Sequence, residues 1–215
     1  MQNQAVKFLI TAGPTQEAID PVRYLTNRSS GKMGYALAAA AARKGHEVIL
    51  ISGPTCLDIP PGVDFLPVQS AADMFTAVQS QIPRADIGVF AAAVADYRPA
   101  EVAEQKIKKT GETLTLDLVR NPDILGSARS AFGFEGILVG FAAETENLEE
   151  NARGKLTRKG CDLIVANDVS RKDIGFDSSQ NEVLLVYPGH SDPLPKDEKE
   201  HLAYHILDAI VTLRR

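Results

Sequence analysis

The sequence predicts an α/β protein in which helices cover a doubly wound, mostly parallel sheet. Strand-like and helix-like segments alternate along most of the 215 residues, which is the pattern of consecutive βαβ units. Several strand-like segments, such as residues 47–52 (EVILIS) and 87–95 (IGVFAAAVA), are unbroken apolar runs. Strands that are buried on both faces of a parallel sheet have this composition.

The first predicted βαβ unit opens the chain. Residues 6–10 form a short apolar strand, and the Ala-rich residues 33–44 form a helix that ends at Gly45. Further strands are expected at 47–52, 63–68, 87–95, 137–143, 162–166 and 182–187, and further helices at 71–82, 121–132, 148–159 and 198–213.

One segment departs from the parallel pattern. Residues 114–119 (LTLDLV) alternate apolar and polar side chains, as a half-exposed antiparallel strand does. The charged residues 98–113 before it interrupt the alternation and are expected to form a flap. We expect a single domain over residues 1–215 that carries this flap.

Composition limits the classes of partner. Apolar residues make up 44% of the chain and the net charge is −5, so there is no general attraction for nucleic acid or an anionic membrane. Cys56 and Cys161 fit neither a CxxC pair nor a zinc spacing, and the first ten residues do not resemble a signal peptide. We expect a cytoplasmic protein with free thiols that holds any phosphate ligand in a local basic pocket.

The loop at residues 27–34 (NRSSGKMG) precedes the first predicted helix and consists largely of small residues. Such a loop lets backbone N–H groups approach a phosphate, but a tight turn before a closely packed helix has the same composition. The loop is not a Walker A motif, because Thr26 and Met33 stand where that motif requires glycine and serine or threonine.

A nicotinamide-dependent reductase is the rival hypothesis. Ser29, Gly31 and Gly34 occupy the three glycine positions of an incomplete dinucleotide fingerprint. However, residues 51–54 (ISGP) lack the acidic ribose ligand expected after the second strand, and no tyrosine is followed four residues later by lysine. Both absences disfavour a dehydrogenase.

Asp96 follows an apolar strand at its carboxyl end, where α/β proteins bind ligands. Its carboxylate can accept ribose hydroxyls or hold Mg²⁺, or it can cap a turn. The lysines of the charged segment, Lys106, Lys108 and Lys109, are either a solvated charge run or part of a flap that closes over an anionic intermediate.

Lys155 and Lys159 lie four residues apart on one face of a predicted helix. Two like charges at this spacing repel each other unless an anion lies between them. Spacing alone favours two exposed lysines, and the anion-binding interpretation stays open beside it.

Taken together, these segments resemble phosphopantothenoylcysteine synthetases over residues 8 to 185. The resemblance rests on six motifs in the same order as in that family. They are residues 13–34 (with GPT, DPVR and NRSSGKMG), 91–97 (AAAVADY), 106–109 (KIKK), 121–124 (NPDI), 140–145 (GFAAET) and 166–169 (ANDV). The lysine motif at 106–109 is similar to that of the bacterial enzymes that use CTP rather than ATP.

The resemblance implies a Rossmann-like fold with a small antiparallel element that pairs two subunits as a homodimer. It also implies a ligase that joins 4′-phosphopantothenate to L-cysteine. In that family CTP, with Mg²⁺, first activates the carboxylate as an acyl-cytidylate and releases pyrophosphate. The cysteine amine then attacks the carbonyl and CMP leaves. Such chemistry requires no nucleophilic side chain.

The resemblance also implies roles for individual residues. Asn27 contacts phosphopantothenate and its acyl-nucleotide, and Lys106 serves the activation step. Asp96 is the ribose or metal carboxylate. The other expected ligand-binding residues are Ser30 and Gly31 in the first loop, Ala91, Ala92 and Ala93 beside Asn27, Asn121, Pro122, Asp123, Ile124 and Phe141 around cytidine, and Lys155 and Lys159 at the triphosphate.

Two departures from the family pattern remain. In many bacteria this activity is fused behind a flavin-dependent phosphopantothenoylcysteine decarboxylase, and no segment here resembles that half. The sequence is therefore compatible with a free-standing synthetase or with one domain of a bifunctional chain. Leu25 and Thr26 stand where isoleucine and serine are expected, a change that preserves size and the hydroxyl group.

Overall fold

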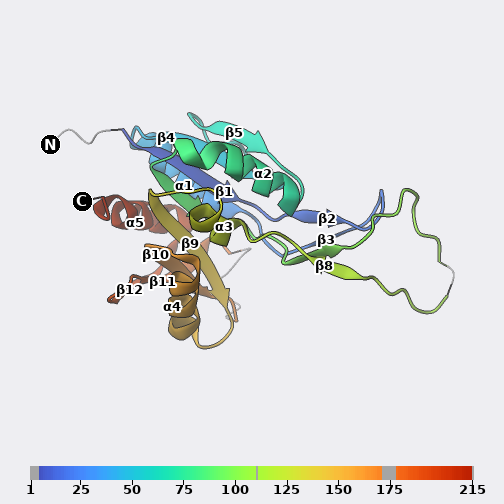
Figure 1. The fold of residues 1–215 in the computed structure, drawn as a ribbon. Coiled ribbons are helices and arrows are strands. Elements are labelled where there is room, and N and C mark those ends of the chain that lie inside the picture. The colour runs from blue at the N-terminus through green and yellow to red at the C-terminus, as the bar shows by residue number, and fades with distance from the viewer. Residues whose placement is uncertain (1–4, 110, 171–177, 215) are drawn as a thin grey trace.

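The computed structural model describes residues 5–109, 111–170 and 178–214. Within them, the main sheet has eight strands in the order β12-β11-β10-β9-β6-β1-β4-β5 (Figure 1). The six strands from β10 to β5 are parallel, and β11 and β12 are antiparallel additions. The strands are β1 Lys7–Ala12, β4 Glu47–Ser52, β5 Asp64–Pro67, β6 Ile87–Phe90, β9 Ile137–Glu144, β10 Leu163–Asp168, β11 Gln180–Val186 and β12 Ser191–Glu198.

Helices cover both faces of the sheet, which confirms the predicted doubly wound fold. Helices α1 (Lys32–Arg43) and α5 (Lys199–Thr212) share one hydrophobic core with alternate residues of the strands. Helices α2 (Ala71–Gln81), α3 (Ile124–Ser130) and α4 (Leu148–Lys159) pack on the other face. No helix among the described residues is long and apolar enough to cross a membrane.

The start of α1 lies unusually close to β1. A Cβ atom placed on Gly34 would lie 2.6 Å from the Cβ atom of Ala12, so any larger side chain would push the helix away from the strand. The small residues of the helix interior, Ala38, Ala40 and Ala41, are buried against the sheet. The glycine and alanines therefore bring the N-terminus of α1 close to the carboxyl end of β1.

The strand order reverses direction between β1 and β6. From β1 the chain moves outward to β4 and β5, whereas from β6 it moves the opposite way to β9 and β10. The loops that follow β1 and β6 therefore diverge and leave a crevice at the carboxyl edge of the sheet. This topological switch point positions the candidate site.

Three local expectations are corrected. The predicted strand at 87–95 ends at Phe90, because the following alanines cross toward Pro14 rather than continuing the ladder. The predicted strand at 114–119 is shorter and later: β8 (Leu118–Arg120) pairs with β7 (Tyr97–Pro99) outside the main sheet. The predicted helix at 121–132 begins only at Ile124, after the Asp123 side chain accepts a hydrogen bond from Gly126.

Two further features were not predicted. Strands β2 (Gln16–Ala18) and β3 (Tyr24–Thr26) form a short hairpin inside the long loop after β1. Strand β12 contains Pro193 and Pro195, residues that argue against a strand in the middle of a sheet. The two prolines are tolerated because β12 is the last strand in the sheet order.

The β2–β3 hairpin with its connecting turn (residues 16–26), strands β7 and β8, and residues 100–109 and 111–117 form an arm that projects from the body (Figure 1). Buried Asp20 accepts hydrogen bonds from the backbone N–H of Ile107 (3.1 Å) and from Arg23, and Arg23 also donates to the Ile107 carbonyl (3.0 Å). The Arg23 hydrogen bond lowers the pKa of Asp20 below its usual value. The expected flap at 98–113 is thus anchored to the β2–β3 hairpin where it passes Ile107.

At the opposite end of the sheet, Arg129 of α3 binds four acceptors in two segments, residues 134–136 and 160–162. Its guanidinium donates to the carbonyls of Phe134 (2.6 Å), Gly136 (2.8 Å) and Gly160 (3.1 Å) and to the carboxylate of Asp162 (2.8 Å). Side-chain replacement would leave all four acceptors without this donor.

We expect Arg129→Met to lower the free energy of unfolding by about 2–3 kcal/mol, because several partly buried acceptors lose a charged donor at once. Urea denaturation measures the change. The control is Arg84→Met, since Arg84 is exposed and should change stability by less than about 0.5 kcal/mol. Equal losses in both variants would contradict a clamping role for Arg129.

Candidate functional site

Two cavities of about 760 and 450 Å³ adjoin each other at the switch point, and they are called the first and second cavity below. The first opens on the side of α3 and α4, and the second is lined by the N-terminal loop of α1 together with residues of β10, β11 and α5. Five residues line both cavities: Ala92, Val94, Asp96, Phe141 and Lys155.

Backbone atoms form the floor that the two cavities share, and hydrogen bonds between two loops hold this backbone in place. The N–H of Ala91 donates to Thr11 O (3.1 Å) and the N–H of Ala93 donates to Gly13 O (2.9 Å). Thr15 makes two further hydrogen bonds: its N–H donates to Ala93 O (3.3 Å) and its hydroxyl accepts from the Ala95 N–H (3.0 Å). These contacts bind the loop after β1 to the loop after β6.

The N-terminus of α1 faces the second cavity without a side-chain cap. Its N-cap residue, Gly31, has φ +76°, and a Cβ atom there would lie 2.8 Å from Thr55 Cγ2. Glycine is therefore required both by conformation and by space. Ser30 and Gly31 line the cavity, and the N-terminus of a helix attracts an anion such as a phosphate.

Asn27 is exposed and lies at the edge of the second cavity. Its Nδ2 donates to Val94 O (3.0 Å) and to Ala93 O (3.4 Å). The side chain thus fastens the α1 loop to the floor, which is a structural contact that the sequence did not predict. Its expected contact with phosphopantothenate stays a prediction.

The loop from Asn121 to Ile124 forms one wall of the first cavity. The amide of Asn121 is occupied at both ends, since Nδ2 donates to Ala95 O (2.9 Å) and Oδ1 accepts from Arg98 (3.1 Å). Asp123 accepts from the Gly126 N–H (2.9 Å) and pairs with Lys159. Burial acts to raise the pKa of Asp123, but these contacts outweigh it and the pKa lies below its usual value.

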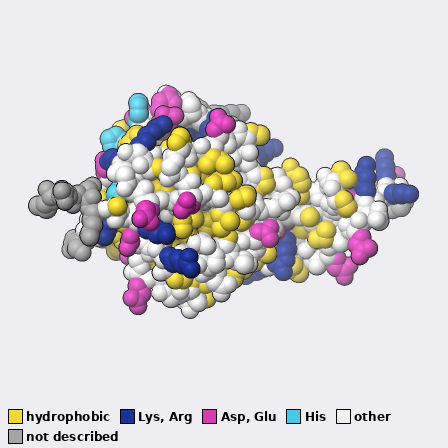
Figure 2. All heavy atoms as spheres, turned by 90° about the horizontal axis from the view of Figure 1, so that it is seen from above, with side chains coloured by type: hydrophobic (Ala, Val, Ile, Leu, Met, Phe, Trp, Pro, Cys, Tyr) yellow, Lys and Arg dark blue, Asp and Glu magenta, His cyan; other side chains and the backbone are white. Residues whose placement is uncertain are grey.

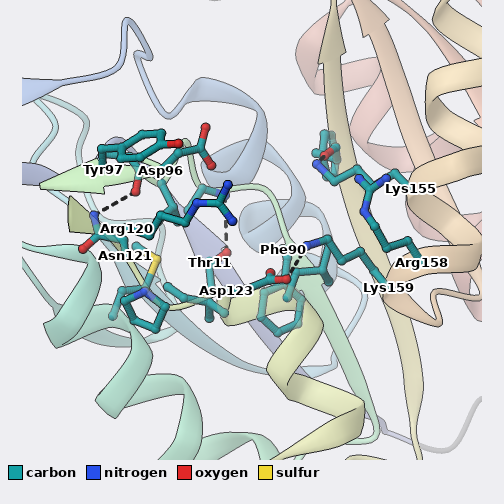
Figure 3. A pocket seen from close by; sticks show the side chains of 18 of the residues that line it. Thr11, Phe90, Asp96, Tyr97, Arg120, Asn121, Asp123, Lys155, Arg158 and Lys159 are labelled. Carbon is teal, nitrogen blue, oxygen red and sulfur yellow. Dashed lines mark hydrogen bonds and ion pairs between the residues drawn. The ribbon is translucent and has the colours of Figure 1, made fainter. Parts of the chain in front are cut away.

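Basic side chains of α4 form the facing wall. Figure 3 shows Lys155, Arg158 and Lys159 across the cavity from Asp96. Lys155 donates to Phe141 O (2.6 Å), and burial lowers its pKa. Because Lys155 and Lys159 each have a partner within the protein, an anion is not needed to separate them. Their position in the cavity nevertheless makes them available to one.

All of the predicted site residues except one meet at these two cavities. Lys106 is exposed on the arm and lines neither of them. The second cavity gains three buried polar residues that were assigned no role: Asn167, Asn181 and Lys199. Asn167 lies in the 166–169 motif, which was a usable signal. Asn181 and Lys199 come from β11 and α5 and reach the cavity only through the tertiary fold.

Mg²⁺ was expected at Asp96. No group of three or more His, Cys, Asp or Glu residues suited to a metal is found in the part of the chain that the structure describes. Asp96 is exposed where the two cavities meet, which fits an ion that takes most of its oxygen ligands from phosphate and water. Asp96 would then hold Mg²⁺, whose charge would help neutralise a bound triphosphate.

A doubly wound sheet with two adjoining polar cavities at its switch point places this chain among Rossmann-like ligand-binding proteins. More specifically, residues 3–213 match the family described as the DNA/pantothenate metabolism flavoprotein C-terminal domain, and the chain belongs to that family.

Curated relatives are consistent with membership of this family. The coenzyme A biosynthesis bifunctional protein CoaBC of Vibrio vulnificus strain YJ016 is 50% identical over 212 residues, which cover 98% of this chain and 53% of that protein. The protein of the same name from Escherichia coli strain K12 is 49% identical over 210 residues, covering 96% of this chain and 52% of the relative. The chain therefore spans about half the length of these curated relatives.

Solved structures share the fold. The C-terminal domain of a CoaBC protein superposes with a TM-score of 0.84 at 42% identity, covering 98% of this chain and 96% of that one. A Cab2 variant solved with phosphopantothenate-cysteine has a TM-score of 0.78 at 19% identity, covering 97% and 86% of the two chains. The second likeness is evidence for the fold alone.

Because the Asn27 side chain donates to two backbone carbonyls, its substitution should affect the stability of the protein. In Asn27→Asp a carboxylate would face two carbonyl oxygens, so we expect a loss of about 1 kcal/mol at pH 7 and a melting temperature lower by roughly 2–4 °C. The neighbouring oxygens would raise the folded-state pKa of the new carboxyl, so the loss should shrink as pH falls through that pKa. Thermal melts at pH 7 and pH 4 measure this.

Asn27→Ala is the matched control, because it removes the same hydrogen bonds but carries no titratable group. Its deficit relative to the native protein should be the same at both pH values. A deficit in Asn27→Asp that does not depend on pH would mean that the side chain turns away from the carbonyls.

Proposed function

We propose that the chain is a CTP-dependent ligase of coenzyme A biosynthesis that joins 4′-phosphopantothenate to L-cysteine. The single observation that carries the proposal is the pair of adjoining cavities with a common floor at Ala92, Asp96 and Phe141. Two elongated anionic substrates can occupy such a pair with their reacting ends together. The names of the relatives, coenzyme A biosynthesis bifunctional proteins, support a role in coenzyme A biosynthesis.

The residues around the common floor suit acyl activation. When a carboxylate attacks the α-phosphate of CTP, two anions are brought together and negative charge accumulates. Lys155, Lys159 and the uncapped N-terminus of α1 offer positive charge and N–H donors around that point. In the second half-reaction the cysteine amine attacks the acyl-cytidylate and CMP departs, so the protein has to position ligands rather than supply a nucleophile.

We also propose a homodimer formed through the arm. Of the eight large hydrophobic residues that are exposed within the described ranges, seven lie on the arm: Val22, Tyr24, Tyr97, Val102, Leu114, Leu118 and Val119. Figure 2 shows hydrophobic side chains along the arm and basic ones toward its tip. Such a surface is typical of an interface. Light scattering at micromolar concentration should give twice the chain mass.

Pyrophosphate release tests the proposed reaction. With 4′-phosphopantothenate and Mg²⁺ we expect release from CTP in the absence of cysteine, and formation of the amide and CMP once cysteine is added. ATP in place of CTP should be a much poorer substrate. Binding of CTP without any pyrophosphate release would reduce the protein to a nucleotide-binding module.

Lys106 provides the sharper test. We expect Lys106→Gln to lower pyrophosphate release without cysteine by roughly a hundredfold, because a cation that contacts the activation transition state is lost. Folding stability should barely change, since Lys106 is exposed. Lys108→Gln and Lys109→Gln are matched controls on the same segment. Equal small losses at all three positions would identify a solvated charge run.

The position of Lys106 adds a second measurement. Because the side chain lines neither cavity, the arm must bring it to a site in its own subunit or in the partner. Mixing Lys106→Gln with Asp96→Asn separates these cases. Activity recovered in mixed dimers means that the lysine serves the partner's site, whereas no recovery means that it serves its own.

A further inference from the structure

The carboxylate of Asp20 is buried in the arm, and its two oxygens have different partners. Asp20 is only 3% exposed. Oδ1 accepts from the backbone N–H groups of Val22 (2.9 Å) and Arg23 (2.9 Å), which closes the turn between β2 and β3. Oδ2 accepts from the Arg23 guanidinium and from the Ile107 N–H (3.1 Å), which lies 87 residues further along the chain. One oxygen thus holds the hairpin turn, and the other holds a distant segment of the arm.

That distant segment carries Lys106, and the hairpin turn binds it on both sides of this lysine. Before Lys106, the Ala103 N–H donates to Ile19 O (3.0 Å). After it, both polar atoms of the Ile107 backbone are engaged, since the N–H donates to Oδ2 of the buried carboxylate and the carbonyl accepts from Arg23 (3.0 Å). The Lys106 side chain itself is exposed. A backbone that is fixed on both sides limits the directions in which this side chain can extend.

A structural role in the hairpin alone does not require a carboxylate. Asparagine and serine side chains close turns of this kind with a single oxygen, and neither carries a charge that loses hydration when it is buried. A carboxylate is better suited than either of them to accept from a guanidinium and a backbone N–H at a second oxygen. The charge of Asp20 is therefore best accounted for by the contacts of Oδ2, which reach the Lys106 segment.

We infer that Asp20 is a positioning residue for the activation step: it fixes the backbone beside Lys106 and so directs the lysine cation toward the reacting phosphate. This inference deepens the proposed ligase function and rests on it. Within one chain, no residue of the turn at 19–23 lines either cavity, so Asp20 acts through Lys106 rather than on a substrate. An arm that is ordered in advance needs less rearrangement when the lysine reaches a site in its own subunit or in the partner.

The two kinetic constants should respond differently to replacement of Asp20. The cavities are built without the hairpin turn, so KM should change little. A transition-state contact that is made less often, or at a longer distance, lowers kcat instead. A misplacement of about 1 Å can cost up to about a hundredfold in rate, so a partial loss of alignment at Lys106 should cost about tenfold.

Asp20→Asn is the test variant, because it is nearly isosteric. Its amide keeps an oxygen for the N–H groups of the turn, but the NH₂ group that takes the place of Oδ2 cannot accept from Ile107 or Arg23. Asp117→Asn is the matched control, since Asp117 is an exposed carboxylate on the same arm. Asp20→Ser replaces Asp20→Asn if circular dichroism shows the latter to be unfolded, because a serine hydroxyl can still close the turn.

Pyrophosphate release without cysteine is measured for the native protein, Asp20→Asn, Lys106→Gln and the double variant. We expect Asp20→Asn to lower kcat about tenfold and to change KM for CTP by less than about twofold. In the Lys106→Gln background the same substitution should cost less than about twofold, because a residue that acts through Lys106 then has no cation to position. Asp117→Asn should release pyrophosphate like the native protein.

Three outcomes would overturn the inference: a native rate in Asp20→Asn, a native rate in Lys106→Gln, or an equal loss from Asp20→Asn in both backgrounds. The last outcome would mean that Asp20 only stabilises the arm. The proposed function fails in a distinguishable way. A native protein that releases no pyrophosphate refutes the ligase and this inference together, whereas independent losses in an active protein refute the role of Asp20 alone.

Discussion

The hydrogen bonds between the loop after β1 and the loop after β6 hold the site together. Without the reciprocal contacts of Gly13 and Thr15 with Ala93 and Ala95, the two halves of the doubly wound sheet would diverge at their carboxyl ends. With them, the diverging strands enclose a floor of backbone that both cavities share. Asn27 strengthens the same junction from the exposed side.

The two faces of the sheet contribute different chemistry at this junction. On the α3–α4 side the lysines are already engaged with Phe141 O and Asp123, so an incoming anion has to compete with or join existing contacts. On the α1 side the helix N-terminus has no side-chain cap and, within the described residues, the buried Oδ1 of Asn181 has no hydrogen-bond partner. Polar groups left open in an otherwise satisfied interior are typical of a ligand site.

The sequence predicted the sheet because parallel strands buried on both faces leave strong apolar patterns, as in β4. It misjudged the arm, whose strands are only three residues each and therefore leave little pattern in the sequence. Motif order predicted most of the residues that line the two cavities, from Asn27 to Lys159. Asn181 and Lys199 were not predicted as site residues, because only the tertiary fold brings β11 and α5 to the cavity.

The prolines of β12 have a consequence for how copies of the chain meet. An outer strand normally offers a row of N–H groups on which a second sheet can grow, and such growth has no natural end. Pro193 and Pro195 remove two of those groups from the eight residues of β12. Open-ended sheet extension at that margin is thereby disfavoured.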